Sequence, residues 1–232
     1  MASFSSSLSP VEIHCKGVLF DSDGILISSI GSVDRSWTRY CRLRGIEPER
    51  ALSIVHGCRA ADTLLRVRPE LKDEDEIAAE LKIIEDFEVE DNDDLRVLPG
   101  VRELLAALPR ERWTVVTSAT DRLVRARLAV GGVPVPERIV TGDDVSRGKP
   151  HPDPYLAGAA LLGVRPEECV VFEDAASGVR AGRAAGCTVV ATTFSHPLEL
   201  LGEAHYRVED LSGVTVTSAN EGLALRFTPL AE

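Results

Sequence analysis

Short apolar segments that alternate with helical patterns are the feature of this sequence that most restricts its fold. Four of these segments have the length of buried β-strands, and they run over Lys16–Phe20, Trp113–Thr117, Cys169–Phe172 and Thr188–Ala191. The segments between them carry apolar residues at the spacing of a helix with one buried face. Apolar strands that alternate with helices predict an α/β fold, in which a parallel sheet is covered by helices on both faces.

The helices expected around this sheet have recognisable ends as well as the right periodicity. One begins after Pro99–Gly100 and stops at Pro109, and another is closed by Gly163, which suits a left-handed cap. We expect helices at 101–108, 123–130, 155–162 and 178–185, and one further short strand at Ile139–Val140. Residues 206–227 contain short β-like pieces and are expected to add strands at one sheet edge, whereas residues 1–12 are expected to form a serine-rich tail.

The stretch Ser28–Arg96 interrupts this alternation. It is rich in charge, contains no strand signal, and has candidate helices at Val33–Arg44, Ala60–Arg66 and Asp75–Glu88. We therefore predict two parts: a sheet core formed by residues 1–27 and 97–232, and an inserted all-helical domain, residues 28–96, that sits over the sheet. The acidic end of the insertion, Glu85–Asp94, is expected to be a solvated face or linker rather than a cation site.

Composition and charge limit which partners and which cellular compartment are expected. The formal charge of −11, with a pI of about 5.0, gives an acidic surface that repels nucleic acid. For the same reason, any site for a phosphorylated metabolite must carry its own cations. No apolar run approaches the length of a membrane span, and the N-terminal segment lacks the pattern of a secretion signal. The five cysteines are scattered, which favours buried thiols over zinc or disulfide sites. We expect a cytoplasmic protein, monomeric as a first assumption, with no nucleic-acid or membrane partner.

Paired carboxylates follow two of the predicted strands. Asp21 and Asp23 come directly after the first, and Glu173 and Asp174 come directly after Cys169–Phe172. Alternate residues of a strand point the same way, so Asp21 and Asp23 can face one site. A polar turn explains the first pair when it is taken alone, and a helix N-terminus explains the second. Together, at strand ends, the carboxylates suit a magnesium ion, which prefers oxygen ligands.

Two further strand ends carry groups that suit a phosphate. Thr117 and Ser118 offer a hydroxyl and backbone amides at the start of a helix, although such residues are also ordinary helix caps. Lys149 is flanked by Gly148 and Pro150, which fix its backbone, and it supplies a cation in an acidic chain. A nucleotide P-loop is excluded there, because five residues separate the glycines and proline follows the lysine. Nucleophile, metal ligands, hydroxyl and lysine at successive strand ends are what phosphoryl transfer requires.

In these motifs the sequence resembles the haloacid dehalogenase superfamily. FDSDG, residues 20–24, is similar to its D-x-D motif, VVTS at 115–118 to its Thr/Ser motif, GKPHPD at 148–153 to its lysine motif, and VFEDAASGVRAGRAAG at 171–186 to its acidic motif. Within the superfamily, the stretches WTRYC, HGCR and FEDA resemble sugar-phosphate and glycerol-phosphate phosphatases of the β-phosphoglucomutase-like subfamily. The resemblance covers essentially the whole chain and implies a Rossmann-like catalytic core with an inserted helical cap.

The resemblance also implies a role for each site residue. Asp21 attacks phosphorus to form an aspartyl-phosphate, and Asp23 is the general acid and base. The transferring phosphoryl group is held by Thr117, the Ser118 amide and Lys149. Mg²⁺ is held by the Asp21 carboxylate, the Asp23 carbonyl and Asp174, with Glu173 acting through water. Arg59 matches a cap arginine that contacts substrate in relatives, although a helix-surface arginine is a nearly equal alternative.

Three functions remain open at this stage. The preferred one is Mg²⁺-dependent hydrolysis of a small phosphorylated sugar or polyol. A β-phosphoglucomutase is less favoured, because the related mutases carry a histidine where this chain has Val33. A phospho-ligand sensor without turnover is disfavoured by the intact set of Asp21, Asp23, Lys149 and Asp174, and a dehalogenase has no use for metal ligation by Asp23 and Asp174.

Overall fold

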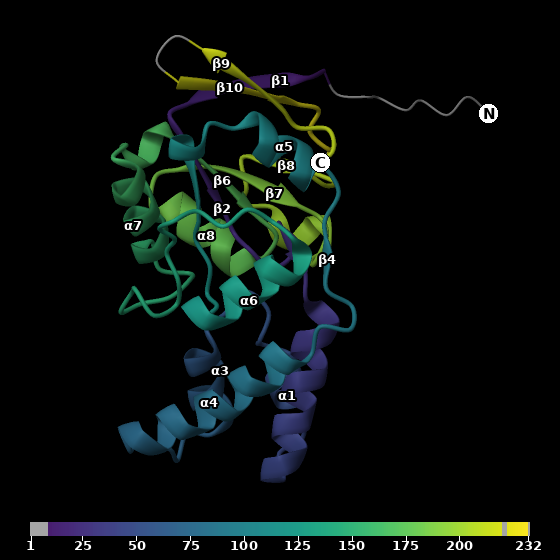
Figure 1. Ribbon diagram of the computed structural model, residues 1–232, viewed down its shortest axis with the longest axis vertical. Helices are drawn as coiled ribbons and strands as arrows, with labels where there is room; N and C mark the ends of the chain where they lie inside the picture. The colour runs from purple at the N-terminus through teal and green to yellow at the C-terminus, as the bar shows by residue number, and fades with distance from the viewer. Residues whose placement is uncertain (1–8, 220–221, 232) are drawn as a thin grey trace, which may run out of the picture.

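A sheet core, a helical end and a small second sheet are stacked along the long axis of the molecule (Figure 1). The computed structural model describes residues 9–219 and 222–231. Residues 1–8 of the serine-rich tail expected at residues 1–12 lie outside this range. Among the residues described, no helix combines the length and apolarity needed to cross a membrane.

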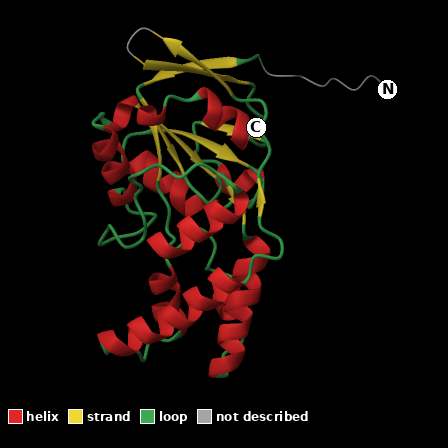
Figure 2. Cartoon of the chain, in the orientation of Figure 1, coloured by secondary structure: helices red, strands yellow, loops and turns green. Residues whose placement is uncertain are grey.

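The core is a parallel sheet of five strands in the order β5-β2-β6-β7-β8 (Figure 2). Its strands are β2 (Gly17–Phe20), β5 (Trp113–Val115), β6 (Cys169–Glu173), β7 (Thr188–Thr192) and β8 (Tyr206–Val208). All four strand pairings are parallel, and every residue of β2, β5 and β6 is buried. The α/β fold class expected from the apolar strands is therefore confirmed.

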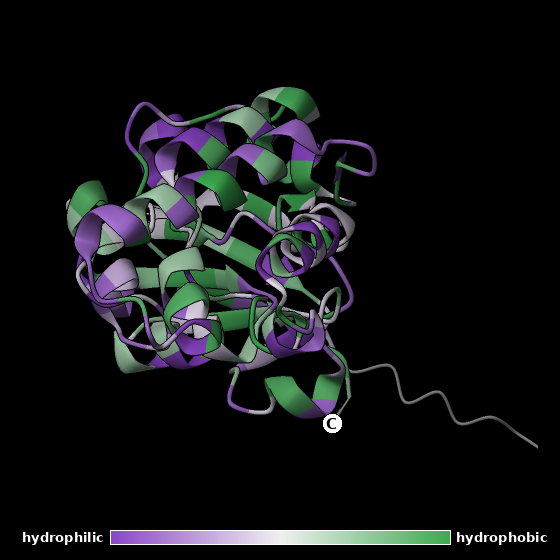
Figure 3. Ribbon diagram, turned by 90° about the horizontal axis from the view of Figure 1, so that it is seen from below, coloured by the Kyte–Doolittle hydropathy of each residue, from purple (hydrophilic) through white to green (hydrophobic). Residues whose placement is uncertain are grey.

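Two separate apolar clusters cover the two faces of this sheet. On one face Val18 and Phe20 pack with α5 (Val101–Ala107) and α6 (Asp121–Gly131). On the other face Leu19 packs with α7 (Asp153–Leu162) and α8 (Ala176–Ala184). The alternation of Val18, Leu19 and Phe20 between clusters follows from the two-residue period of a strand. In Figure 3 the strands of this sheet are largely green between helices that carry both colours.

The inserted helices gather at one end of the molecule, beyond the carboxyl ends of the sheet strands (Figure 1). They are α1 (Ile30–Arg44), α2 (Glu49–Leu52), α3 (Ala60–Val67) and α4 (Glu74–Glu90). Their own core is built around Trp37, Tyr40, Leu64 and Ile84, none more than 1% exposed. The expectation of no strand between residues 28 and 96 is wrong at its two ends, because β3 (Ile27–Ser28) pairs antiparallel with β4 (Arg96–Val97) where the insertion leaves and returns.

A three-stranded antiparallel sheet lies at the opposite end of the molecule (Figure 1). It consists of β1 (Val11–Cys15), β10 (Gly222–Phe227) and β9 (Thr215–Ala219) in that order. The sequence predictions are corrected here in two respects. Only β8 extends the main sheet, and Val11–Glu12 belong to a strand rather than to a tail. The physical reason is that β9 and β10 form an antiparallel pair, and the alternating residues of β1 supply the antiparallel partner for the other edge of β10.

The strand expected at Ile139–Val140 is reduced to a single parallel bridge between Val116 and Val140. The pairing stops because the Asp144 carboxylate accepts hydrogen bonds from both the Thr141 amide and the Thr141 hydroxyl, at 2.8 and 2.7 Å. The short 3₁₀ turns Arg110–Arg112, Pro166–Glu168 and Leu198–Leu201 complete the regular structure.

Truncation of a buried leucine on α6 should destabilise the whole core. Leu128 has no exposed surface, whereas Val130 on the same helix is 55% exposed. Leu128→Ala should lower the free energy of unfolding by about 2–5 kcal/mol, because lost burial and a residual cavity both contribute. The matched control Val130→Ala should change it by less than about 0.5 kcal/mol. Urea denaturation measures both, and equal effects would contradict the assignment of α6 to the sheet face.

Candidate active site

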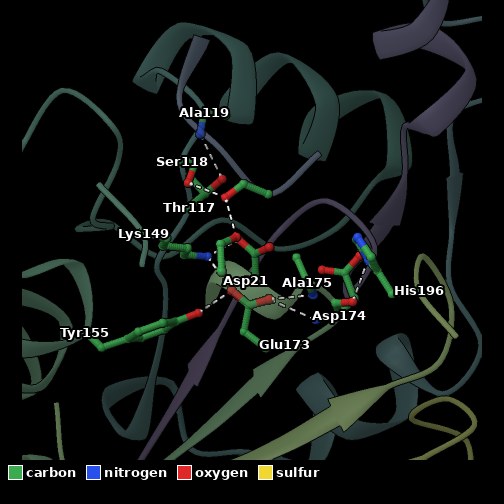
Figure 4. A network of polar contacts seen from close by, with 12 residues as sticks. Asp21, Thr117, Ser118, Ala119, Lys149, Tyr155, Glu173, Asp174, Ala175 and His196 are labelled. Atoms are coloured by element: carbon green, nitrogen blue, oxygen red, sulfur yellow. Dashed lines mark hydrogen bonds and ion pairs between the residues drawn. The ribbon is translucent and has the colours of Figure 1, made fainter. Parts of the chain in front are cut away.

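The carboxyl ends of β2 and β6 bring the two carboxylate pairs together. The strands are paired in register, with Phe20 opposite Phe172, and the Asp21 amide donates to the Phe172 carbonyl at 3.0 Å. Asp21 therefore begins its turn directly beside Glu173. One carboxylate oxygen each of Asp21, Glu173 and Asp174 lies within 4.8 Å of the others, and all three residues are buried. Figure 4 shows these carboxylates converging from the two strand ends.

Lys149 lies between two of these carboxylates. Its ammonium is 2.9 Å from Asp21 Oδ1 and 2.6 Å from Glu173 Oε1, and its side chain is 1% exposed. Burial disfavours the charged lysine, but the carboxylates of Asp21 and Glu173 outweigh it and raise the pKa of Lys149. The lysine is therefore a fixed cation next to the Asp21 carboxylate.

Glu173 already has four hydrogen-bond donors. Oε1 accepts from Lys149 and from the Tyr155 hydroxyl at 2.7 Å, and Oε2 accepts from the backbone amides of Asp174 and Ala175 at 2.9 and 3.0 Å. A Cβ at Gly178 would lie 1.6 Å from Oε1, so α8 needs glycine at this position. This saturation favours Glu173 as a support for Lys149 and for the Asp174 turn rather than as a direct metal ligand.

The turn after Asp21 is shaped by Gly24. Its φ is +81°, and a Cβ there would lie 1.8 Å from Asp174 Oδ2. Only glycine combines this left-handed backbone with so close an approach. The turn thereby packs directly on Asp174.

Electrostatics explain why this group of residues suits a divalent cation. Burial raises the pKa of Asp21 to about 7, with Lys149 opposing the shift, and burial raises the pKa of Asp174 well above its usual range. Three buried carboxylates with one lysine leave excess negative charge, which must be relieved by protons or by a metal ion. Asp21 and Asp174, with carboxylate oxygens facing a common point, fit Mg²⁺ by donor chemistry.

Asp23 is set apart from this cluster. Its Oδ1 accepts hydrogen bonds from the Ser29 hydroxyl at 2.5 Å and from Arg127 Nη1 at 3.0 Å. Its side chain is 29% exposed and lines the same cavity as Asp21. The carboxyl is therefore free of the carboxylate cluster, as a proton-transfer group needs to be.

Thr117 and Ser118 lie on another side of Asp21, at the end of β5 and before α6 (Figure 4). Thr117 is 2% exposed, and its hydroxyl accepts a hydrogen bond from the Ala119 amide at 3.1 Å. The Ser118 hydroxyl donates to the Gly57 carbonyl of the inserted segment at 3.4 Å. Both residues line the cavity, so the structure brings together Asp21, Asp23, Thr117, Ser118 and Asp174 around one space with Lys149 behind Asp21.

That space is a cavity of about 400 Å³ between the sheet edge and the inserted helices. The core contributes Asp21, Thr117 and Asp174, and the inserted segment contributes residues that include Val33, Trp37, His56, Leu81 and Glu85. The Gly57 carbonyl also accepts a hydrogen bond from Ser177 at 3.0 Å. The inserted segment thus rests on the core at Gly57 and encloses the carboxylates.

Arg59 lines the cavity, but its guanidinium is occupied. Nε and Nη2 donate to Asp62 at 2.8 and 2.9 Å, and Nη1 donates to the carbonyls of Val145 and Ser146. In this arrangement Arg59 ties the inserted segment to a core loop. Contact with substrate requires some of these bonds to exchange, so the specificity role of Arg59 stays a prediction.

At Glu85, Glu88 and Asp91 the acidic stretch Glu85–Asp94 is not the solvated face that its charge pattern predicts, whereas Glu90 and Asp93 are exposed. Glu85 accepts from Thr120 and Arg122, and Asp91 accepts from Arg35. Glu88 is 6% exposed and lies 3.7 Å from Arg127. The prediction fails because basic partners distant in sequence neutralise these acids, and the linear pattern carries no sign of that pairing.

Sequence reasoning did not single out Arg127, which donates to Asp23, or Glu88, which lies beside Arg127. It also did not single out Tyr155, which donates to Glu173. Arg127 lies inside a helix with several arginines, and only its burial distinguishes it from the half-buried Arg125. Tyr155 belongs to the apolar face of α7, where its hydroxyl has no signature in the sequence.

The family follows from comparison with known proteins. The profile of haloacid dehalogenase-like hydrolases matches residues 15–186, which include all four strand-end motifs. The chain belongs to this family. The resemblance expected from the motifs is confirmed.

The similar proteins include phosphatases and a protein described as a putative mutase. Hexitol phosphatase A of Escherichia coli is 42% identical over 90% of this chain and 98% of its own length. Glycerol-1-phosphate phosphohydrolase 1 of Saccharomyces cerevisiae is 33% identical over 84% of this chain and 81% of its own length. These two relatives confirm the expectation that the chain is an enzyme, a phosphoric monoester hydrolase. A solved structure described as a putative β-phosphoglucomutase from Bacteroides vulgatus has a TM-score of 0.71 and 30% identity, and the match covers 86% of each chain.

Glu88 should make stability depend on pH in a defined direction. Burial raises the pKa of Glu88 to about 7, with the charge of Arg127 opposing. An acid whose pKa is higher in the folded state stabilises the fold at low pH, and that contribution is lost as pH rises from about 4.5 through 7. Relative to Glu88→Gln, which stays neutral, the natural protein should lose up to about 3 kcal/mol between pH 5 and pH 8.

Denaturation of both proteins in chelator-treated buffer at the two pH values checks this expectation. A constant difference between them, or a gain for the natural protein at pH 8, would show that the Arg127 ion pair outweighs burial of the carboxylate.

Proposed function

We propose that this protein hydrolyses small sugar or polyol phosphate monoesters with Asp21 as the nucleophile. The observation that carries the proposal is the position of Asp21: its carboxylate lines a cavity of about 400 Å³, with Lys149 at 2.9 Å and Asp174 beside it. A carboxylate held by a buried lysine cannot move far, so it is fixed in place for attack on a group that enters the cavity.

In the proposed first step an Asp21 oxygen forms a bond to phosphorus while the bond from phosphorus to the sugar or polyol oxygen breaks. The product is an aspartyl-phosphate and a free alcohol. Lys149 offsets the negative charge of the attacking carboxylate, and Thr117 with the Ser118 amide holds phosphoryl oxygens. These roles agree with the placement of Thr117 and Ser118 on the cavity wall.

Asp23 provides the proton transfers. Its protonated carboxyl gives a proton to the leaving oxygen, and the resulting carboxylate then takes a proton from the water that attacks phosphorus. The phosphorus–Asp21 bond breaks, inorganic phosphate leaves, and both aspartates return to their starting states. The position of Asp23 outside the carboxylate cluster supports this division of labour.

The acidic cluster would hold Mg²⁺ through the carboxylates of Asp21 and Asp174 and the Asp23 carbonyl, with Glu173 in support. When bound, the ion neutralises charge that builds up on the phosphoryl oxygens. The residues fit such an ion because burial and mutual repulsion disfavour the charged carboxylates of Asp21 and Asp174, and the charge of Lys149 offsets this only in part.

Two observations support a small sugar or polyol phosphate as the substrate: the size of the enclosed cavity and the names of the relatives. The cavity is large enough for a single sugar or polyol and is walled by Trp37 and Leu81 as well as by polar side chains. Relatives that match this chain over most of their length are named for hexitol, glycerol-1-phosphate and 2-deoxyglucose-6-phosphate substrates. The monomeric state and the cytoplasmic location stay predictions.

A phosphosugar mutase is the second candidate, favoured by the likeness to the putative β-phosphoglucomutase. Val33 lines the cavity and offers no polar atom that would direct Asp23 toward a sugar hydroxyl in place of water. Release of inorganic phosphate faster than isomerisation of β-glucose 1-phosphate would favour the phosphatase.

The proposal predicts phosphate release that depends on both the metal and Asp21. Purified protein with Mg²⁺ should turn over one or a few members of a panel of hexitol, glycerol and hexose phosphates. Asp21→Asn should reduce kcat by at least about 10⁴-fold, because the amide is not a nucleophile. Chelation should reduce it comparably, with recovery on added Mg²⁺.

The matched control is Asp75→Asn, an aspartate exposed in the first turn of α4, which should keep full activity. A folded protein that is silent across the panel would contradict the phosphatase, and full activity of Asp21→Asn would contradict the nucleophile.

A further inference from the structure

Arg127 is a buried arginine that the steps above do not use. It belongs to α6 of the core, is 2% exposed, and also lines the cavity. The one side-chain hydrogen bond described for its guanidinium runs from Nη1 to Asp23 Oδ1 at 3.0 Å. Within the described part of the chain, Nε and Nη2 have no hydrogen-bond partner.

Such an arrangement is costly for stability. Each unsatisfied buried donor loses its hydrogen bonds to water without replacement, and a buried guanidinium requires a compensating charge. An arginine that served only to pack α6 would be replaced without loss by an apolar side chain of similar volume. The cost indicates a task at Asp23, the carboxylate to which Arg127 donates a hydrogen bond.

Two donors meet at a single oxygen of Asp23. The Ser29 hydroxyl and Arg127 Nη1 both donate to Oδ1, and among the described residues no side-chain hydrogen bond reaches Oδ2. An oxygen that accepts two hydrogen bonds, one from a cation, is a poor site for a proton. The transferable proton of Asp23 is therefore directed to Oδ2, and the carboxyl plane is fixed by the two bonds to Oδ1.

The inserted segment holds Arg127 from the other side. Glu88 of α4 has a carboxylate oxygen 3.7 Å from Arg127 Nη2, and both side chains are nearly inaccessible to solvent. The contacts of Glu88 with Arg127 and of Arg127 with Asp23 thus cross from the inserted helices to the turn after β2. Ser29, which begins the insertion just before α1, donates to the same Asp23 oxygen.

We propose that Arg127 is a positioning residue for Asp23. Together with Ser29 it anchors Oδ1, so that Oδ2 carries the proton delivered to the leaving alcohol and later accepts the proton of the attacking water. Glu88 orients the guanidinium, which makes the proton-transfer geometry depend on the inserted segment being seated on the core. This inference rests on the proposed function, in which Asp23 is the acid and base.

The test compares two leaving groups, because only one of them needs a proton. Arg127→Met should lower kcat about 10²-fold on glycerol or hexitol phosphate, whose alkoxide needs the proton of Asp23, with KM changed by less than about threefold. With p-nitrophenyl phosphate, whose phenolate leaves unprotonated, a stopped-flow burst of one phenolate per enzyme should keep its rate to within about tenfold. The turnover that follows the burst should be slow, because water activation also needs Asp23.

Two further variants separate positioning from folding. Arg127→Lys keeps a cation and should recover part of the lost kcat, and Ser29→Ala, which removes only the second donor to Oδ1, should show the same pattern with a smaller loss. Thermal unfolding of each variant checks that it is folded.

Three outcomes would overturn the inference. They are equal loss of the burst and of the alkyl-phosphate reaction in folded Arg127→Met, a raised KM with unchanged kcat, and no preference for lysine over methionine in either substrate. A natural protein that turns over neither substrate would overturn the proposed function, and this inference with it.

Discussion

The ion pairs of Lys149 with Asp21 and Glu173 are the interaction on which the rest of the site depends. They bring the ends of β2 and β6 and the loop before α7 to a single buried ammonium, with distances of 2.9 and 2.6 Å. Removal of the lysine would leave two carboxylates buried without compensation, a loss of about 3–5 kcal/mol. Tyr155 and the amides of Asp174 and Ala175 occupy the remaining acceptor positions of Glu173. Of the two carboxylates that Lys149 contacts, the one that remains available is therefore Asp21, which faces the cavity.

The inserted helices turn this sheet edge into an enclosed site. They supply much of the cavity wall, rest on the core through the Gly57 carbonyl, and send Glu88 inward to Arg127. Enclosure removes water, which strengthens each charge interaction at Asp21 and Asp23. The core therefore provides the reacting groups, and the insertion provides their environment and the walls against which a substrate is recognised.

Local patterns in the sequence were sufficient for the sheet core and for the strand-end residues. The buried runs at β2, β5, β6 and β7 and the motifs at Asp21, Thr117, Lys149 and Asp174 are short and contiguous, so their chemistry can be seen along the chain. Pairings between distant segments could not be seen. The pairing of β1 with β10 joins residues more than 200 positions apart, and the contact of Arg127 with Asp23 spans 104 positions. The burial of Glu88 against Arg127 joins α4 to α6, two helices that are separated in the sequence by β4, α5 and β5.

The most direct test of nucleophilic attack by Asp21 is to identify the residue that becomes phosphorylated. The enzyme is mixed with substrate for a single turnover and quenched in acid. Borohydride then reduces an aspartyl-phosphate to homoserine, and peptide mass spectrometry locates the homoserine. If Asp21 is the nucleophile, homoserine should be found at position 21 and unmodified aspartate at positions 23 and 174. Modification at another residue, or phosphate released at full rate with position 21 unmodified at every time point, would contradict it.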